Sequence, residues 1–218
     1  MTDSDASAAR DNMIARQLRP NQVRDARILD AMGEIPREAF LPEGKRGIAY
    51  VDNAIEVARD RFLLSPMVFG RLVEAAGIRP DDRVLDVGCL TGYSTAVLAR
   101  LAAAVVAIDR EPELVDQAHT LVSRHGAADA QVFLVDDLAA GYAAAAPYDV
   151  ILCEGAVDCV PDALRAQLRD GGRLLAVIDR SPGTGQATLF ERSGDIVSSR
   201  ALFEAGAPRL PGFARAQG

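Results

Sequence analysis

The chain has 218 residues, 49% hydrophobic and 25% charged, a composition typical of a globular protein with a single domain. Its formal net charge of −7 argues against a large nucleic-acid-binding surface. No apolar run approaches the ~18 residues of a membrane span, and the polar, acidic start differs from a signal peptide. Three cysteines and two histidines, without a CxxC motif, argue against a disulfide framework and a zinc site. We therefore expect a cytoplasmic protein with reduced thiols and no metal.

The first third of the chain predicts a helical cap. Residues 1–8 are expected to be disordered. Apolar residues at helical spacing over 12–32 predict two helices, separated at Pro20 because proline breaks a helix. Residues 34–44 and 49–57 are expected to be irregular.

From residue 65 onward the pattern alternates between helices and strands. Ser65 and Pro66 predict the start of a helix that Gly77 ends. Short, continuous apolar runs then alternate with helical segments, which is typical of a parallel sheet covered on both faces. Near the end, 186–194 and 195–206 predict an antiparallel strand pair.

This order predicts an α/β fold with a doubly wound, Rossmann-like seven-stranded sheet and an antiparallel C-terminal strand pair. It is the layout of a class I methyltransferase, whereas a nicotinamide-binding domain would more usually continue with a sixth parallel strand. We expect one domain, made of an N-terminal helical cap (9–60), a Rossmann-like core (61–205) and a tail (206–218).

The stretch RVLDVGCLTGYSTAVLARL (83–101) reads as a strand, a glycine turn and a helix. In doubly wound sheets, ligands bind beyond the carboxyl ends of the strands, at such a turn. Gly88 and Gly92 mark it, but Leu90 stands where such turns usually carry a glycine. About 20 residues further on, Asp109 ends the next strand, where a carboxylate suits a ribose diol.

The acidic residue before the turn distinguishes between two kinds of cofactor. Asp86 would repel a pyrophosphate but attract the ammonium and sulphonium groups of S-adenosyl-L-methionine. We therefore predict this methyl donor, with S-adenosyl-L-homocysteine as product. The predicted cofactor-binding residues are Asp86, Gly88, Cys89, Leu90, Gly92, Asp109, Arg110, Asp136 and Asp137.

Over residues 12–178 the sequence resembles the protein-L-isoaspartate O-methyltransferases. The resemblance lies in the motifs MIARQLR, ILDAMGEIPREAF, AYVD, LDVGCLTGYSTAVLA, APYDVIL, VPDALRAQL and GGRLL. It implies methylation of the free carboxylate of isoaspartyl residues in damaged proteins or peptides. It also implies that Asp86, Gly88 and Gly92 line the methionine part of the donor and that Asp109 holds the ribose. Asp137, with Asp136 as the alternative, would lie near the adenine.

The sequence departs from the family pattern in three places. Leu90 replaces the middle glycine, at a cost of about 1–2 kcal/mol if φ is positive there. Phe62 and Leu64 stand where the family has a threonine and a serine, although Ser65 is adjacent. Glu154 and Asp179 replace a small polar residue and a glycine. We expect Leu64, Ser65 and Glu154 on the acceptor side, as the catalytic positions.

These departures leave other functions open. One alternative is a methyltransferase with a remodelled pocket for an apolar or cationic acceptor. Another is a non-catalytic interaction module that has lost donor binding, with Leu90 as its main argument. A dehydrogenase is the most distant alternative. We expect neither nucleic acid nor a membrane as a partner, and the sequence leaves the oligomeric state open.

Overall fold

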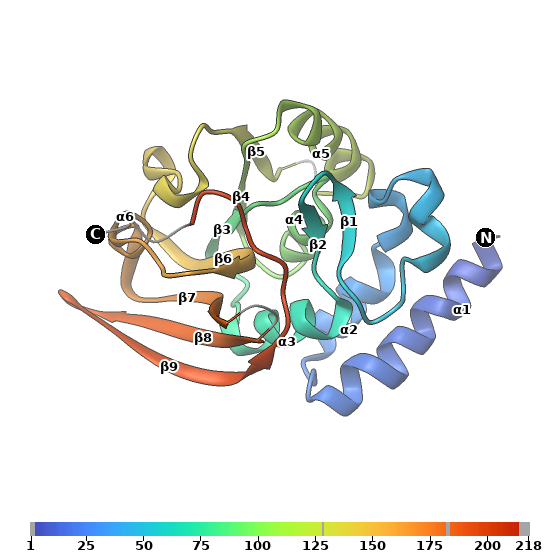
Figure 1. Ribbon diagram of the computed structural model, residues 1–218, viewed down its shortest axis with the longest axis horizontal. Coiled ribbons are helices and arrows are strands. Elements are labelled where there is room, and N and C mark those ends of the chain that lie inside the picture. Colours follow the sequence, from blue (N-terminus) through green and yellow to red (C-terminus); the bar gives the residue numbers. More distant parts are fainter. Residues whose placement is uncertain (1–2, 128, 182–183, 214–218) are drawn as a thin grey trace.

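The computed structural model describes residues 3–127, 129–181 and 184–213. A seven-stranded sheet runs through it in the order β5-β4-β3-β6-β7-β8-β9 (Figure 1). The neighbours from β5 to β7 pair in parallel, whereas β8 and β9 are antiparallel. The predicted fold class and the terminal strand pair are therefore confirmed. The strands are β3 (Arg83–Val87), β4 (Ala104–Asp109), β5 (Gln131–Leu134), β6 (Tyr148–Val157), β7 (Leu168–Ser181), β8 (Thr184–Ser193) and β9 (Ile196–Ala205).

Helices cover the sheet and form the N-terminal cap. The α-helices are α1 (Asp3–Met13), α2 (Ala26–Glu34), α3 (Pro66–Ala76), α4 (Tyr93–Leu98), α5 (Pro112–Arg124) and α6 (Asp162–Ala166). In the part of the chain that the structure describes, the other helical segments are one π-helical turn (Ile14–Leu18) and five 3-10 turns (Arg19–Asn21, Arg37–Phe40, Glu43–Ile48, Leu138–Ala140 and Ala143–Ala145). None of the helices in the described ranges combines the length and apolar character that crossing a membrane requires.

Local chemistry explains where α3 begins and ends. The Ser65 hydroxyl accepts a hydrogen bond from the Val68 amide at 3.4 Å, and Pro66 occupies the first helical position. Gly77 ends the helix with φ = 54°, a conformation that costs glycine little. The predicted boundaries of this helix are confirmed.

Two expectations for the N-terminal third were wrong. Residues 3–8 belong to α1 rather than to a disordered tail, because Ala6 is buried and Arg10 anchors the helix by donating to the Tyr50 hydroxyl. Within 49–57, which was expected to be irregular, β1 (Ile55–Ala58) begins and pairs with β2 (Arg61–Leu63) in an antiparallel hairpin. The two strands are too short for the alternation of side chains to show in the sequence.

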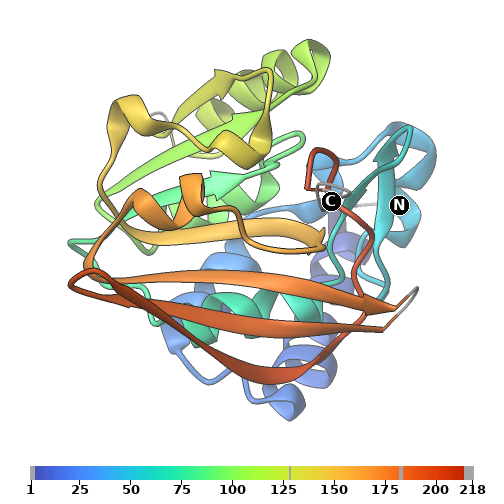
Figure 2. The ribbon, with the colours of Figure 1, turned by 60° about the vertical axis from the view of Figure 1, so that its left-hand side comes forward.

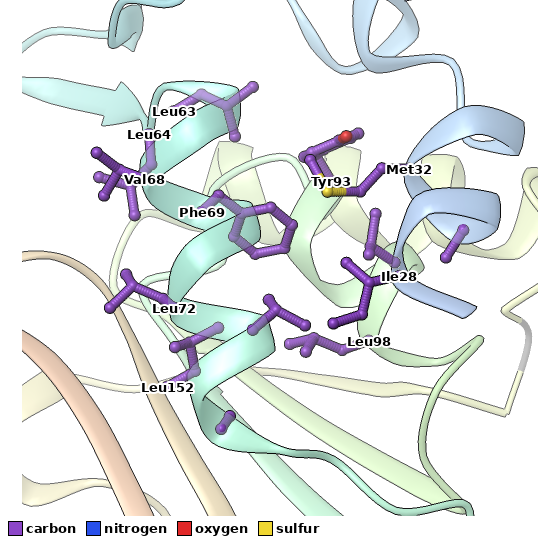
Figure 3. Close-up of a cluster of buried hydrophobic side chains, with 14 of the residues drawn as sticks. Ile28, Met32, Leu63, Leu64, Val68, Phe69, Leu72, Tyr93, Leu98 and Leu152 are labelled. Carbon is purple, nitrogen blue, oxygen red and sulfur yellow. The ribbon is translucent and has the colours of Figure 1, made fainter. Parts of the chain in front are cut away.

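The largest core cluster joins the N-terminal cap to one face of the sheet. Figure 3 shows Phe69 of α3 pointing toward Tyr93 of α4, and their ring centroids are 5.8 Å apart. Met32 of α2 and Leu152 of β6 belong to the same cluster. The cap therefore packs tightly on the sheet, close to the turn that follows β3.

After β9 the chain turns back over the carboxyl ends of the parallel strands (Figure 2). The Leu210 amide donates to the Ala156 carbonyl, the Ala156 amide donates to the Pro208 carbonyl, and both distances are 2.8 Å. This short parallel bridge ties the tail to the end of β6.

Candidate active site

The glycine turn after β3 has the shape that the sequence predicts. Gly88, Leu90 and Gly92 have φ values of 85°, 55° and 92°. Leu90 therefore lies in the left-handed region, where a leucine is strained by about 1–2 kcal/mol. Its side chain is only 2% exposed and belongs to the main core cluster. A Cβ at position 92 would lie 2.5 Å from the Val122 side chain of α5, so the close packing of α5 on the turn favours a glycine at position 92.

Asp86 lies completely buried at the base of the turn. Its Oδ2 accepts hydrogen bonds from the Ser94 and Thr95 hydroxyls, both at 2.7 Å. Among the described residues, its Oδ1 has no hydrogen-bond partner. Burial raises the pKa of Asp86 to about 6, and the nearby Asp109 carboxylate adds to this rise. Asp86 thus retains one free acceptor in a place where a ligand cation would be favoured.

Asp109, the predicted ribose ligand, is already fully engaged. Its two oxygens accept from Nη1 and Nη2 of Arg61, at 2.8 and 2.6 Å. The same carboxylate accepts from the backbone amides of Leu90, Arg110 and Glu111, at 2.9, 2.7 and 3.1 Å. The side chains of Arg61 and Asp109 are 3% and 0% exposed. The guanidinium of Arg61 therefore occupies both oxygens of the carboxylate that the sequence analysis predicts for a ribose diol.

Leu210 of the tail covers the first glycine of the turn. A Cβ at Gly88 would lie 2.6 Å from Leu210 Cδ1. Arg209 secures this part of the tail through ion pairs with Asp158 and Asp179, at 3.0 and 2.8 Å. Leu210 thus covers the first glycine of the turn at which the sequence analysis predicts the donor.

The residues of the turn suit S-adenosyl-L-methionine, and in this structure two other side chains stand in its predicted site. The turn and the free oxygen of Asp86 suit it, but Arg61 occupies Asp109 and Leu210 covers Gly88.

The other predicted cofactor residues surround this closed pocket. Asp136 and Asp137 are exposed, and Asp137 Oδ1 accepts from the Ala139 amide at 2.9 Å. Arg110 is exposed and pairs with a neighbouring glutamate. Cys89 is buried in the turn, and burial raises the pKa of its thiol well above the usual value. Their roles in donor binding stay predictions.

The predicted acceptor side lies between β2 and β6. Leu64 is buried, and its carbonyl accepts from Arg37 Nη2 at 2.5 Å. The Ser65 hydroxyl caps α3, as described above, and Phe62 is half-buried. Glu154 of β6 is 4% exposed, and its Oε1 has no hydrogen-bond partner in the described part of the chain. Burial raises the pKa of Glu154 well above its usual value; Asp86 raises it further, and Arg37 opposes the rise.

Sequence reasoning missed Arg61 and Leu210, the two side chains that close the pocket. Arg61 lies in the stretch 58–64, for which the sequence predicts no helix or strand, and nothing distinguishes it there from the neighbouring Arg59. Leu210 lies in a proline-containing tail, where nothing local indicates a partner. Within the described ranges, no group of three or more His, Cys, Asp or Glu side chains could hold a metal ion.

A model of the family "Protein-L-isoaspartate(D-aspartate) O-methyltransferase (PCMT)" matches residues 9–204. A protein-L-isoaspartate O-methyltransferase of Methylorubrum extorquens (strain PA1) is 37% identical over 196 residues, which cover 90% of this chain and 85% of that protein.

Two solved structures are similar to this chain in fold. One described as a protein-L-isoaspartate O-methyltransferase has a TM-score of 0.82 at 26% identity and covers 93% of this chain and 66% of that one. A Plasmodium falciparum protein, described as a beta-aspartate methyltransferase (PCMT) in complex with S-adenosyl-L-homocysteine, has a TM-score of 0.73 at 15% identity, covering 94% of this chain and 98% of that one; it shows the fold alone. The family model matches residues 9–204, and the Methylorubrum extorquens protein is 37% identical over 90% of this chain. The chain therefore belongs to the protein-L-isoaspartate(D-aspartate) O-methyltransferase family.

Proposed function

We propose that the protein is an S-adenosyl-L-methionine-dependent methyltransferase that methylates the free carboxylate of isoaspartyl residues in proteins or peptides. Family membership over residues 9–204 is the observation that carries this proposal. The relative from Methylorubrum extorquens, which bears this activity in its name, matches over 85% of its own length. The proposal includes a cytoplasmic location, which rests on the small, odd number of cysteines.

Two features of the site support the proposal. The turn from Gly88 to Gly92 keeps its two left-handed glycines, and Asp86 offers an unpartnered, buried oxygen close to it. An isoaspartyl carboxylate is ionised at pH 7, so the acceptor itself needs no general base. The protein's contribution would then be mainly to position the acceptor and to exclude water.

The acceptor side favours a second candidate, a methyltransferase for a neutral or cationic acceptor. Leu64 is apolar and buried where the family has a serine, and the Ser65 hydroxyl is engaged in capping α3. Glu154 adds a carboxyl group that becomes negative when it ionises, and this charge would repel an anionic acceptor.

A methylation assay with paired peptides tests the proposal. We would incubate the full chain with S-adenosyl-L-methionine and a peptide containing either isoaspartate or aspartate, and detect the methyl ester by mass spectrometry. The proposal predicts an ester on the isoaspartyl peptide alone. Methylation of neither peptide, together with methylation of a neutral or amine-containing acceptor, would favour the second candidate.

A further inference from the structure

The ion pair between Arg61 and Asp109 has the same two-bond geometry that a carboxylate would use to bind the two hydroxyls of a ribose. A guanidinium donates two parallel N–H···O bonds to a carboxylate, as the two hydroxyls of a diol can. Here the two bonds measure 2.8 and 2.6 Å, and both side chains are buried. Arg61 and a ribose cannot use the same two oxygens of Asp109 at once.

The tail segment 207–213 fills the adjoining space. Besides the Cδ1 of Leu210 over Gly88, the Cβ of Leu210 would lie 3.0 Å from a Cβ at Gly155. Two backbone hydrogen bonds with Ala156 fix this register. Further along, a Cβ at Gly212 would lie 3.4 Å from Asp137 Oδ1, so the tail extends to the predicted adenine end of the pocket.

We propose that Arg61 and segment 207–213 form an internal plug, which occupies the donor pocket and which the donor must displace in order to bind. This inference rests on the proposed function, because it assumes that a nucleoside donor is the competing ligand. The plug differs from a permanent loss of the pocket, because the turn, Asp86 and Asp109 all remain in place beneath it.

The construction of the plug allows it to move. Arg61 lies on a two-stranded hairpin whose tip is exposed: the side chain of Arg59 there is 96% exposed. The tail is irregular, and it is held by the backbone hydrogen bonds with Ala156, by the buried side chains of Leu210 and Phe213, and by the ion pairs of Arg209. The carboxylates that pair with Arg209 are 20% and 8% exposed, so water screens these ion pairs only in part and their loss should loosen the tail. If the plug is seated in 99% of molecules, the apparent affinity for the donor falls by about 100-fold.

Calorimetric titration with S-adenosyl-L-homocysteine tests the plug. Arg61→Met removes the competing guanidinium at similar side-chain length, and Arg209→Ala loosens the tail without altering the pocket wall. Arg59→Met, on the same hairpin, is the matched control. We expect both plug variants to bind at least ten-fold more tightly than the wild type, and the control to bind equally. Because Arg61→Met leaves a buried carboxylate unpaired and could unfold, Arg209→Ala provides an independent variant.

Hydrogen exchange of the amides of Ala156 and Leu210 gives a second readout, without methyl transfer. Both amides are hydrogen-bonded in the plugged form, so their exchange should accelerate when S-adenosyl-L-homocysteine is added to the wild type. Equal, tight binding by all four proteins with unchanged exchange would overturn the plug and leave the proposed function intact. No binding by any folded variant would overturn the proposed function as well, in favour of a non-catalytic module.

Discussion

Leu90 is subject to two opposing effects on stability. Its backbone has φ = 55°, which strains an L-residue by about 1–2 kcal/mol. Its side chain is 2% exposed and packs in the core, where removal of a leucine typically costs about 2–5 kcal/mol. Two substitutions separate these effects, because they remove the same packing but differ in the strain.

Leu90→Ala loses the packing and retains the strained Cβ, so we expect a loss of about 2–5 kcal/mol. Leu90→Gly loses the packing and relieves about 1–2 kcal/mol of strain, but it adds about 0.4–1 kcal/mol of freedom to the unfolded chain. The free energy of unfolding of the glycine variant should therefore be about 1 kcal/mol higher than that of the alanine variant. At Ala75 in α3, substitution by glycine should lower stability by about 1 kcal/mol, the opposite sign.

Urea unfolding of the wild type and the three variants, extrapolated linearly to water, measures these differences. If Leu90→Gly is less stable than Leu90→Ala by as much as the Ala75→Gly control is less stable than the wild type, then the strain assigned to this turn is wrong. The difference between the two Leu90 variants would then come from the backbone entropy of glycine alone.

Three further predictions concern buried polar groups. Burial raises the pKa of Glu154 above the value near 4.3 of an unfolded chain, so this group lowers stability as pH rises from about 4 through the raised pKa. Glu154→Gln should therefore gain stability relative to the wild type between pH 5 and 8, measured by urea unfolding; the exposed Glu191→Gln should not, and an equal gain there would contradict the cause. Ser65→Ala should lower the free energy of unfolding by about 1 kcal/mol through loss of the helix cap, and an unchanged value would mean that the cap contributes nothing. Arg37→Met should lower it by about 3 kcal/mol, because two buried backbone carbonyls lose a charged donor; a loss below 1 kcal/mol would indicate that water replaces it.

The sheet could be predicted because its signals are local. The parallel strands β3, β4 and β6 contain continuous apolar runs, and each of them is followed by a helix, α4, α5 or α6. Serine, proline and glycine likewise mark both ends of α3 within a few residues. The turn of residues 88–92 could be predicted for the same reason, because its glycines stand next to the strand that positions them.

The closure of the pocket could not be predicted, because it depends on contacts between distant residues. Arg61 and Asp109 are 48 positions apart, and no local sequence pattern indicates that the two residues pair. Leu210 reaches Gly88 only because the tail pairs with the end of β6. Side chains of this kind follow from tertiary packing, which local patterns do not encode.

The buried charges connect the closed pocket with the kind of ligand that could open it. Asp86, Asp109 and Glu154 are buried acids, and Arg37 and Arg61 are buried bases. Burial raises the pKa of Glu154 well above its usual value and so disfavours its charge, whereas Asp109 is paired with Arg61 by two short hydrogen bonds. Moving Arg61 into solvent would leave one uncompensated negative charge next to the turn, and an unpaired buried charge is costly. A cationic ligand would restore the balance, whereas a pyrophosphate would add further negative charge. The arrangement therefore disfavours a dinucleotide for a reason additional to the position of Asp86, and it favours a positively charged occupant.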